Sequence, residues 1–190
     1  MKTRRTLLAA GLLTALTALL AGCGDGGSDS AAVPDGWGTL KTKGVDVSYP
    51  KGSDGYQEQS GADRSKYNAA AAVRTEDGRT VSIITVQLGF TQADSAEQAA
   101  IGAEAGIQMG ASVKGDKDVK LAGTDEAKRI DFSFKSGGQG DDPPKGTPVK
   151  GVILTGLDSS DTTFAIRVDA VAGKLSDADL NRIIKSVEVH

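Results

Sequence analysis

The residues best suited to chemistry stand near the start of the chain, in the run Leu20-Ala21-Gly22-Cys23. Cys23 is the only cysteine, so an intrachain disulfide and a multi-cysteine metal site are excluded. A thiol that follows two small residues suits another reaction. Its soft sulfur accepts a diacylglyceryl group, and the small neighbours let a protease reach the preceding peptide bond. We therefore predict lipid attachment at Cys23, with a structural free thiol as the alternative.

The residues before this cysteine have the pattern of an export signal. Lys2, Arg4 and Arg5 form a basic start, and residues 6–20 are apolar. As a helix this run covers roughly 22 Å, which is short of the ~30 Å hydrocarbon core of a bilayer. We predict that residues 1–22 are a lipoprotein signal peptide and not a membrane span. Two acyl chains on the cysteine would then hold the protein at the extracytoplasmic face of the membrane. The adjacent arginines leave general and twin-arginine export both open.

Other side chains give weaker indications. The sole histidine, His190, ends the chain, and a frayed terminus holds a catalytic base poorly. Neighbouring carboxylates occur at Asp116 and Asp118 and at Asp141 and Asp142, in polar or glycine-rich surroundings that favour a solubilising role. We predict no catalytic residue, no cofactor and no metal site. An envelope hydrolase that uses carboxylates remains the alternative.

The overall charge limits the partners. The chain has 25 acidic and 22 basic residues, and three of the basic ones precede Cys23. An acidic surface does not suit the phosphates of nucleic acid, so nucleic-acid binding is not expected. The oligomeric state cannot be inferred from these features.

The rest of the chain divides into a tether and one domain. Residues 23–36 hold the cysteine and then glycine, serine and aspartate, a composition typical of a flexible linker with a reach of roughly 20 Å. Residues 37–190 have the length and apolar content of a single domain.

Within this domain the apolar periodicity predicts mainly strands. Asp77-Gly78 favours a tight hairpin, and residues 80–90 are apolar on both faces, as in a central strand. A helix is expected over 94–110 and another after Ser176, the predicted N-cap. The strands are expected at 45–49, 68–75, 80–90, 112–121, 126–134, 147–157 and 162–171. The long segment 136–148 is rich in glycine and proline, which favours disorder over a binding loop.

Several of these segments together resemble a known group. Trp37, GVDVSYP (44–50), LAGTDEAKRIDFSF (121–134), FAIRVDAV (164–171) and SDADLNRIIKSVEV (176–189) are similar to the LpqN-type lipoproteins of actinobacteria, whose fold is like that of PsbP. The resemblance implies an α+β fold, an α/β/α sandwich in which an antiparallel sheet of about six to seven strands has helices on its faces. It also implies a non-enzymatic binding or accessory role in the cell envelope, toward a protein partner or a small apolar or lipid ligand.

Overall fold

The computed structural model describes residues 33–190, which form ten strands and two helices. The strands are β1 (Trp37–Lys41), β2 (Val45–Pro50), β3 (Gln57–Glu58), β4 (Ala70–Glu76), β5 (Arg79–Leu88), β6 (Ser112–Asp118), β7 (Ala127–Lys135), β8 (Pro148–Leu157), β9 (Thr163–Val171) and β10 (Glu188–Val189). The helices are α1 (Ala96–Ala105) and α2 (Asp177–Lys185). Cys23 and the predicted signal peptide lie outside the described residues.

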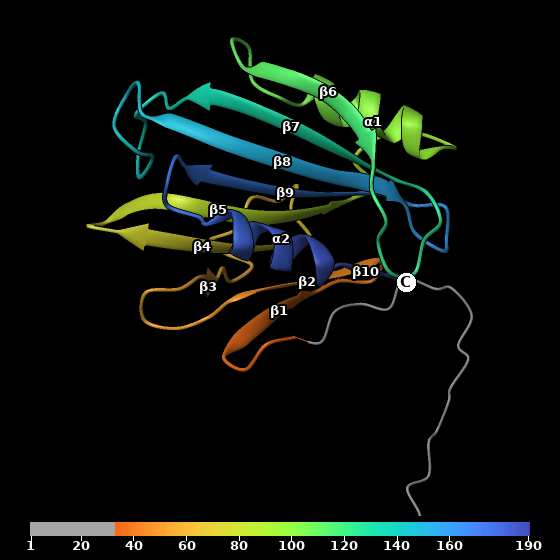
Figure 1. The fold of residues 1–190 in the computed structure, drawn as a ribbon, viewed down its shortest axis with the longest axis horizontal. Coiled ribbons are helices and arrows are strands. Elements are labelled where there is room, and N and C mark those ends of the chain that lie inside the picture. The colour runs from red at the N-terminus through yellow and green to blue at the C-terminus, as the bar shows by residue number, and fades with distance from the viewer. Residues whose placement is uncertain (1–32) are drawn as a thin grey trace, which may run out of the picture.

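Seven strands form one antiparallel sheet in the order β3-β4-β5-β9-β8-β7-β6 (Figure 1). Strand β5 lies inside this sheet, which confirms the central position predicted for residues 80–90. Asp77 and Gly78 form the two-residue turn between β4 and β5, with φ angles of 50° and 73°. Positive φ at both positions is what a type I′ hairpin turn requires. The α+β class and the antiparallel sheet predicted from the sequence are confirmed.

The large sheet separates two apolar cores, as neighbouring residues of β8 illustrate. Leu154 is fully buried in the core that also contains Ile183 of α2. Ile153 belongs to the other core, with Ala100 and Ala103 of α1. Successive side chains of a strand point to opposite faces, so the two helices cover opposite faces of the sheet. Helices on both faces were predicted, and the structure has them.

A second sheet, which the sequence analysis did not predict, packs on the α2 side. It has three strands in the order β1-β2-β10. Val45 and Val47 of β2 are fully buried in the same core as Leu154. Strand β10 has only two residues, which pair with Asp46 and Val45. So short a strand carries no periodicity, and its pairing with a segment near the start of the domain leaves no local signal.

Helix α1 is shorter than the predicted helix over 94–110. Its predicted cap is present, because the Ser95 hydroxyl accepts a hydrogen bond from the Gln98 amide at 3.3 Å. The helix ends at Gly106, the C-cap residue, where glycine disfavours continuation. Gly102 allows a close approach to the preceding loop, since a Cβ at this position would lie 2.9 Å from Cγ2 of Thr91.

The C-terminal end of α2 is joined to β2 by a buried serine. The Ser186 hydroxyl accepts a hydrogen bond from the Ser48 amide at 2.9 Å and donates one to the Ile183 carbonyl at 2.7 Å. We expect Ser186→Ala to lower the free energy of unfolding by about 1–3 kcal/mol, because it leaves the Ser48 amide buried without this acceptor. Urea denaturation measures the change. Ser53→Ala, at an exposed turn, is the control and should change it by less than about 0.5 kcal/mol. Equal effects of the two variants would contradict the assignment.

Candidate functional site

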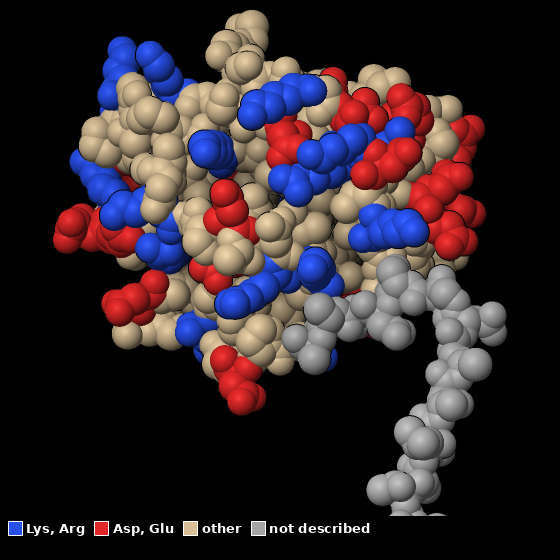
Figure 2. Space-filling view, in the orientation of Figure 1, with Lys and Arg blue, Asp and Glu red and all other residues tan. Residues whose placement is uncertain are grey.

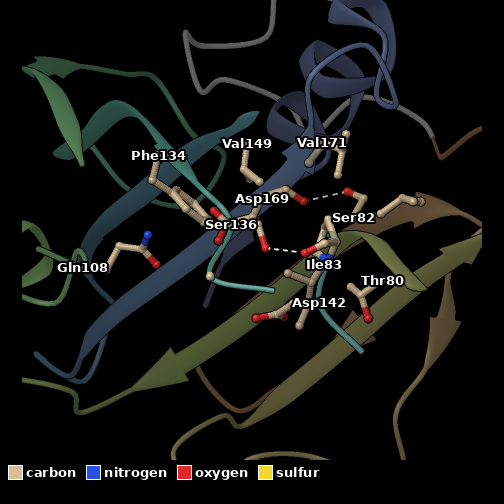
Figure 3. A pocket seen from close by; sticks show the side chains of 14 residues that line it. Thr80, Ser82, Ile83, Gln108, Phe134, Ser136, Asp142, Val149, Asp169 and Val171 are labelled. Carbon is tan, nitrogen blue, oxygen red and sulfur yellow. Dashed lines mark hydrogen bonds between the residues drawn. The ribbon is translucent and has the colours of Figure 1, made fainter. Parts of the chain in front are cut away.

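A cavity of about 110 Å³ lies on the α1 side of the large sheet, beyond the end of α1. Its walls come from β5, β9, the ends of β7 and β8, and the segment 136–147 that connects those two strands. Figure 3 shows the lining side chains, with Phe134, Ser136 and Asp169 gathered close together. We call this space cavity 1. It is lined by Thr80, Val81, Ser82, Ile83, Gln108, Phe134, Ser136, Gly137, Asp142, Pro143, Val149, Asp169, Ala170 and Val171.

The carboxyl group of Asp169 is the most unusual group in this wall. Its Oδ2 accepts a hydrogen bond from Nε of Arg167 at 2.9 Å. The same oxygen forms an ion pair with Nη2 of this guanidinium at 2.8 Å. Its Oδ1 is buried and has no hydrogen-bond partner within residues 33–190. Burial raises the pKa of Asp169 to about 6, against the opposing effect of Arg167. A buried acceptor without a partner lowers the stability of the folded protein, so a hydrogen-bond donor that reaches this oxygen would bind favourably.

Aromatic rings hold Arg167 in place. Its guanidinium lies over the Phe132 ring, 4.8 Å from the centroid, and 6.0 Å from that of Phe134. The two rings are stacked, with centroids 6.1 Å apart and planes inclined by 12°. Gly151 makes this packing possible, because a Cβ there would lie 2.1 Å from the Phe132 ring and 2.6 Å from Oδ1 of Asp169. The glycine thus allows the ring and the carboxyl group to meet over β8.

A second cavity, of about 190 Å³, lies on the other side of Arg167, and we call it cavity 2. The strand register places the two cavities in one row. Ile83 of β5 lies opposite Asp169 and lines cavity 1, whereas Thr85 lies opposite Arg167 and lines cavity 2. Polar and apolar surface contribute about equally to cavity 2, which is lined by Thr85, Gln87, Phe90, Gly102, Ala103, Gly106, Ile153, Ala165 and Arg167. The site is therefore a row of two spaces with the Arg167–Asp169 pair between them.

The segment 136–147 is ordered, which differs from the disorder predicted from its composition. Arg79 donates hydrogen bonds to the carbonyls of Gly140 and Asp142, at 2.9 and 3.1 Å. The Thr80 amide donates to the Asp141 carbonyl at 2.8 Å. Within the segment, the Ser136 hydroxyl donates to the Pro143 carbonyl at 2.6 Å. These bonds fix the segment on the β4–β5 hairpin, where it forms part of the wall of cavity 1.

The carboxylates noted in the sequence lie in different places. Asp142 lines cavity 1, but its side chain is exposed. Asp116 and Asp118 lie on the exposed edge strand β6 and, with Glu97 of α1, bind the ammonium group of Lys128 at 2.7–3.3 Å. The hydrogen bond that Lys128 donates to Glu97, with those it donates to the two aspartates, raises the pKa of Lys128. Acidic side chains gather on this side of the molecule (Figure 2). This ion-pair cluster is separate from the two cavities.

The terminal His190 is held more firmly than expected. Its amide donates a hydrogen bond to the Gly44 carbonyl at 2.9 Å, and its carbonyl accepts one from the Ser159 amide at 2.7 Å. Its imidazole lies 3.4 Å from Asp46. The expectation of a frayed end was wrong, because β10 pairs with β2 immediately before it. The prediction of no catalytic role for this residue stays a prediction.

The central residues of the site were missed in the sequence. Arg167 and Asp169 alternate with the buried Ile166 and Val168, so they point to the opposite face of an interior strand. Charged side chains on a covered face of a central strand were the signal that could have identified the pair. Within residues 33–190 there is no cluster of three or more histidine, cysteine, aspartate or glutamate side chains arranged to hold a metal ion.

Comparison with known proteins adds little about this site. No family model matches the chain, and no curated protein matches it. The chain is similar to a crystal structure of a protein from Bacteroides thetaiotaomicron VPI-5482, with 15% sequence identity and a TM-score of 0.43. The similarity covers 77% of this chain and 45% of that protein. The chain therefore spans less than half the length of that protein. In the described part of the chain, neither helix has the length and apolar character needed to cross a membrane.

The packing around Gly151 gives a direct test of this geometry. Gly151→Ala should lower the free energy of unfolding by about 1–3 kcal/mol, because the new Cβ collides with the Phe132 ring and Asp169. Thermal denaturation followed by circular dichroism measures the effect. Gly61→Ala is the matched control, since a Cβ at this exposed position meets nothing within 4 Å. If both variants have the melting temperature of the wild type, Phe132 and Asp169 do not meet over Gly151.

Proposed function

We propose that this chain is a lipid-anchored, extracytoplasmic protein of the cell envelope that acts as a non-enzymatic binding module. The signal-like residues 1–22 and the lipidation sequence that ends at Cys23 support the location. The tether over residues 23–36 supports a domain held just off the bilayer. The resemblance to LpqN-type lipoproteins implies the same kind of role. The ligand site is the row formed by cavities 1 and 2.

One observation carries the assignment of a binding role to this site. Oδ1 of Asp169 is buried without a hydrogen-bond partner, in a wall that combines polar and apolar surface. Ligand sites place polar groups that fix orientation beside apolar surface, and the lining of cavity 1 contains both. A ligand that donates to Oδ1 would satisfy the carboxyl group, so binding would relieve a cost that the free protein bears.

The arrangement of carboxyl groups favours binding over hydrolysis. A hydrolase of the carboxylate type places two carboxyl groups on opposite sides of the reacting bond and gives them different roles. In cavity 1 Asp169 is already bound to Arg167, and the other carboxyl group, that of Asp142, is exposed on a loop. Neither arrangement resembles a nucleophile paired with a base. We therefore propose binding without turnover.

Native mass spectrometry tests the proposal. The full chain is incubated with envelope extract from its source cells, purified in detergent and transferred intact to the gas phase. We expect a discrete added mass that is lost in Ile83→Trp, because the indole fills cavity 1. Lys114→Trp, on the exposed edge strand β6, is the control and should keep the added mass. A bare polypeptide mass, or an added mass that survives in Ile83→Trp, would contradict a ligand in this cavity.

The anchor is tested separately. We expect Cys23→Ser to move the protein from the detergent phase to the aqueous phase in Triton X-114 partitioning, because stable attachment depends on the two acyl chains. Ser28→Ala, in the tether, should stay in the detergent phase. Retention of Cys23→Ser in the detergent phase would show that the apolar segment of residues 6–20, and not a lipid, holds the protein.

A further inference from the structure

We propose that cavity 1 takes a primary ammonium group on a short aliphatic chain, with the ammonium bound to Oδ1 of Asp169. This inference rests on the proposed binding function and names the chemical class of its ligand.

The free acceptor requires a donor. Oδ1 of Asp169 is buried and unpartnered among the described residues, while Oδ2 is already used by Arg167. The nearby serine donors are also occupied. The Ser82 hydroxyl donates to the backbone carbonyl of Asp169 at 2.7 Å, and that of Ser136 donates to the Pro143 carbonyl at 2.6 Å. Since these hydroxyls serve the protein itself, the ligand must bring the donor to Oδ1.

The charge of the wall selects a cation. The ionisable side chains that line cavity 1 are those of Asp169 and Asp142. Arg167, which lines cavity 2, balances the negative charge of Asp169. The Arg79 guanidinium donates its hydrogen bonds to the carbonyls of Gly140 and Asp142. One uncompensated carboxylate therefore remains beside the space. An anion is repelled by it, and an ammonium group forms charge-assisted hydrogen bonds that are stronger than those of a neutral donor.

The remaining walls suit a short hydrocarbon chain. Ile83, Phe134, Val149 and Val171 contribute apolar surface, and Pro143 adds more from the segment 136–147. A volume of about 110 Å³ is several times what one water molecule needs by the same measure. A chain of a few methylene groups fits such a space. The same ammonium chemistry is available on a free small amine and at the end of a lysine side chain.

The groups facing Asp169 determine how binding depends on pH. Arg167 on the same strand forms an ion pair with Asp169, and Asp142 lines the cavity from its loop. From β5, β7 and β8, the lining or contacting side chains around Asp169 are uncharged. Burial holds the pKa of Asp169 at about 6, so protonation of this carboxyl group at lower pH removes the acceptor that the ammonium needs. Amine binding should therefore weaken as the pH falls through this value.

The experiment compares three probes on the full chain in detergent micelles. They are n-butylammonium chloride, the neutral 1-butanol and sodium butyrate, and the readout is the methyl NMR signal of Ile83 and Val149. Butylammonium stays protonated near pH 8, as lysine does. We expect saturable shifts with butylammonium at about pH 8, affinity weaker by about tenfold or more at about pH 5, and no saturable shift with butyrate.

Two variants separate the binding role from a folding defect. Asp169→Asn should weaken butylammonium binding by about tenfold or more, and Asp142→Asn, which leaves the Arg167–Asp169 pair intact, by a few-fold. Asp54→Asn, at an exposed turn, is the control and should bind as the wild type does. The inference is overturned if 1-butanol binds as tightly as butylammonium, if both cavity variants bind normally, or if none of the probes binds saturably.

N-acetyl-lysine methylamide identifies the source of the amine. Tighter binding of this probe than of butylammonium would indicate a lysine side chain, and weaker binding a free small amine. The outcome is independent of the native mass experiment. A discrete envelope ligand together with no amine binding would retain the binding module and reject its ligand class. A bare polypeptide in that experiment would instead reject the binding module itself.

Discussion

The burial of one carboxyl group determines the arrangement of the α1 side of the sheet. Asp169 faces a covered surface of an interior strand, where an uncompensated charge would cost several kcal/mol. Arg167, two residues earlier on the same face, supplies the compensation to one oxygen. Its guanidinium in turn rests on the Phe132 ring, and that ring fits only because residue 151 is a glycine. Each of these features follows from the one before it.

The small side chains of α1 explain why this face retains open space. The residues that α1 buries are alanines, and its packing is concentrated on β7 and β8. Large side chains in the same positions would extend over β9 and β5 and fill the row of cavities beside Arg167. The small sheet and α2 cover most of the opposite face with valine, tyrosine and isoleucine side chains, and a pocket beside Leu180 of α2 remains on that face.

The sequence predicts the fold better than the site. Apolar alternation and the Asp77-Gly78 turn correctly place the long strands and the β4–β5 hairpin, because these signals are local. The two-residue strand β10 and the early end of α1 at Gly106 depend on tertiary packing and on the cost of glycine, and neither shows in a periodic pattern. The segment 136–147 has a composition typical of disorder, yet Arg79 orders it through backbone carbonyls. Backbone acceptors carry no sequence signature.

The site itself escaped prediction because its central pair looks like an interruption of an apolar strand. Only the knowledge that β9 has neighbours on both sides makes Arg167 and Asp169 unusual. Carbon-13 NMR of the Asp169 carboxyl group, followed across pH in the free chain, tests the account most directly. We expect a titration midpoint near 6, because Oδ1 is buried and has no hydrogen-bond partner among residues 33–190. A midpoint near the ordinary aspartate value of about 3.9 would show that this oxygen is solvated or paired, and would contradict a receptive carboxyl group in the cavity.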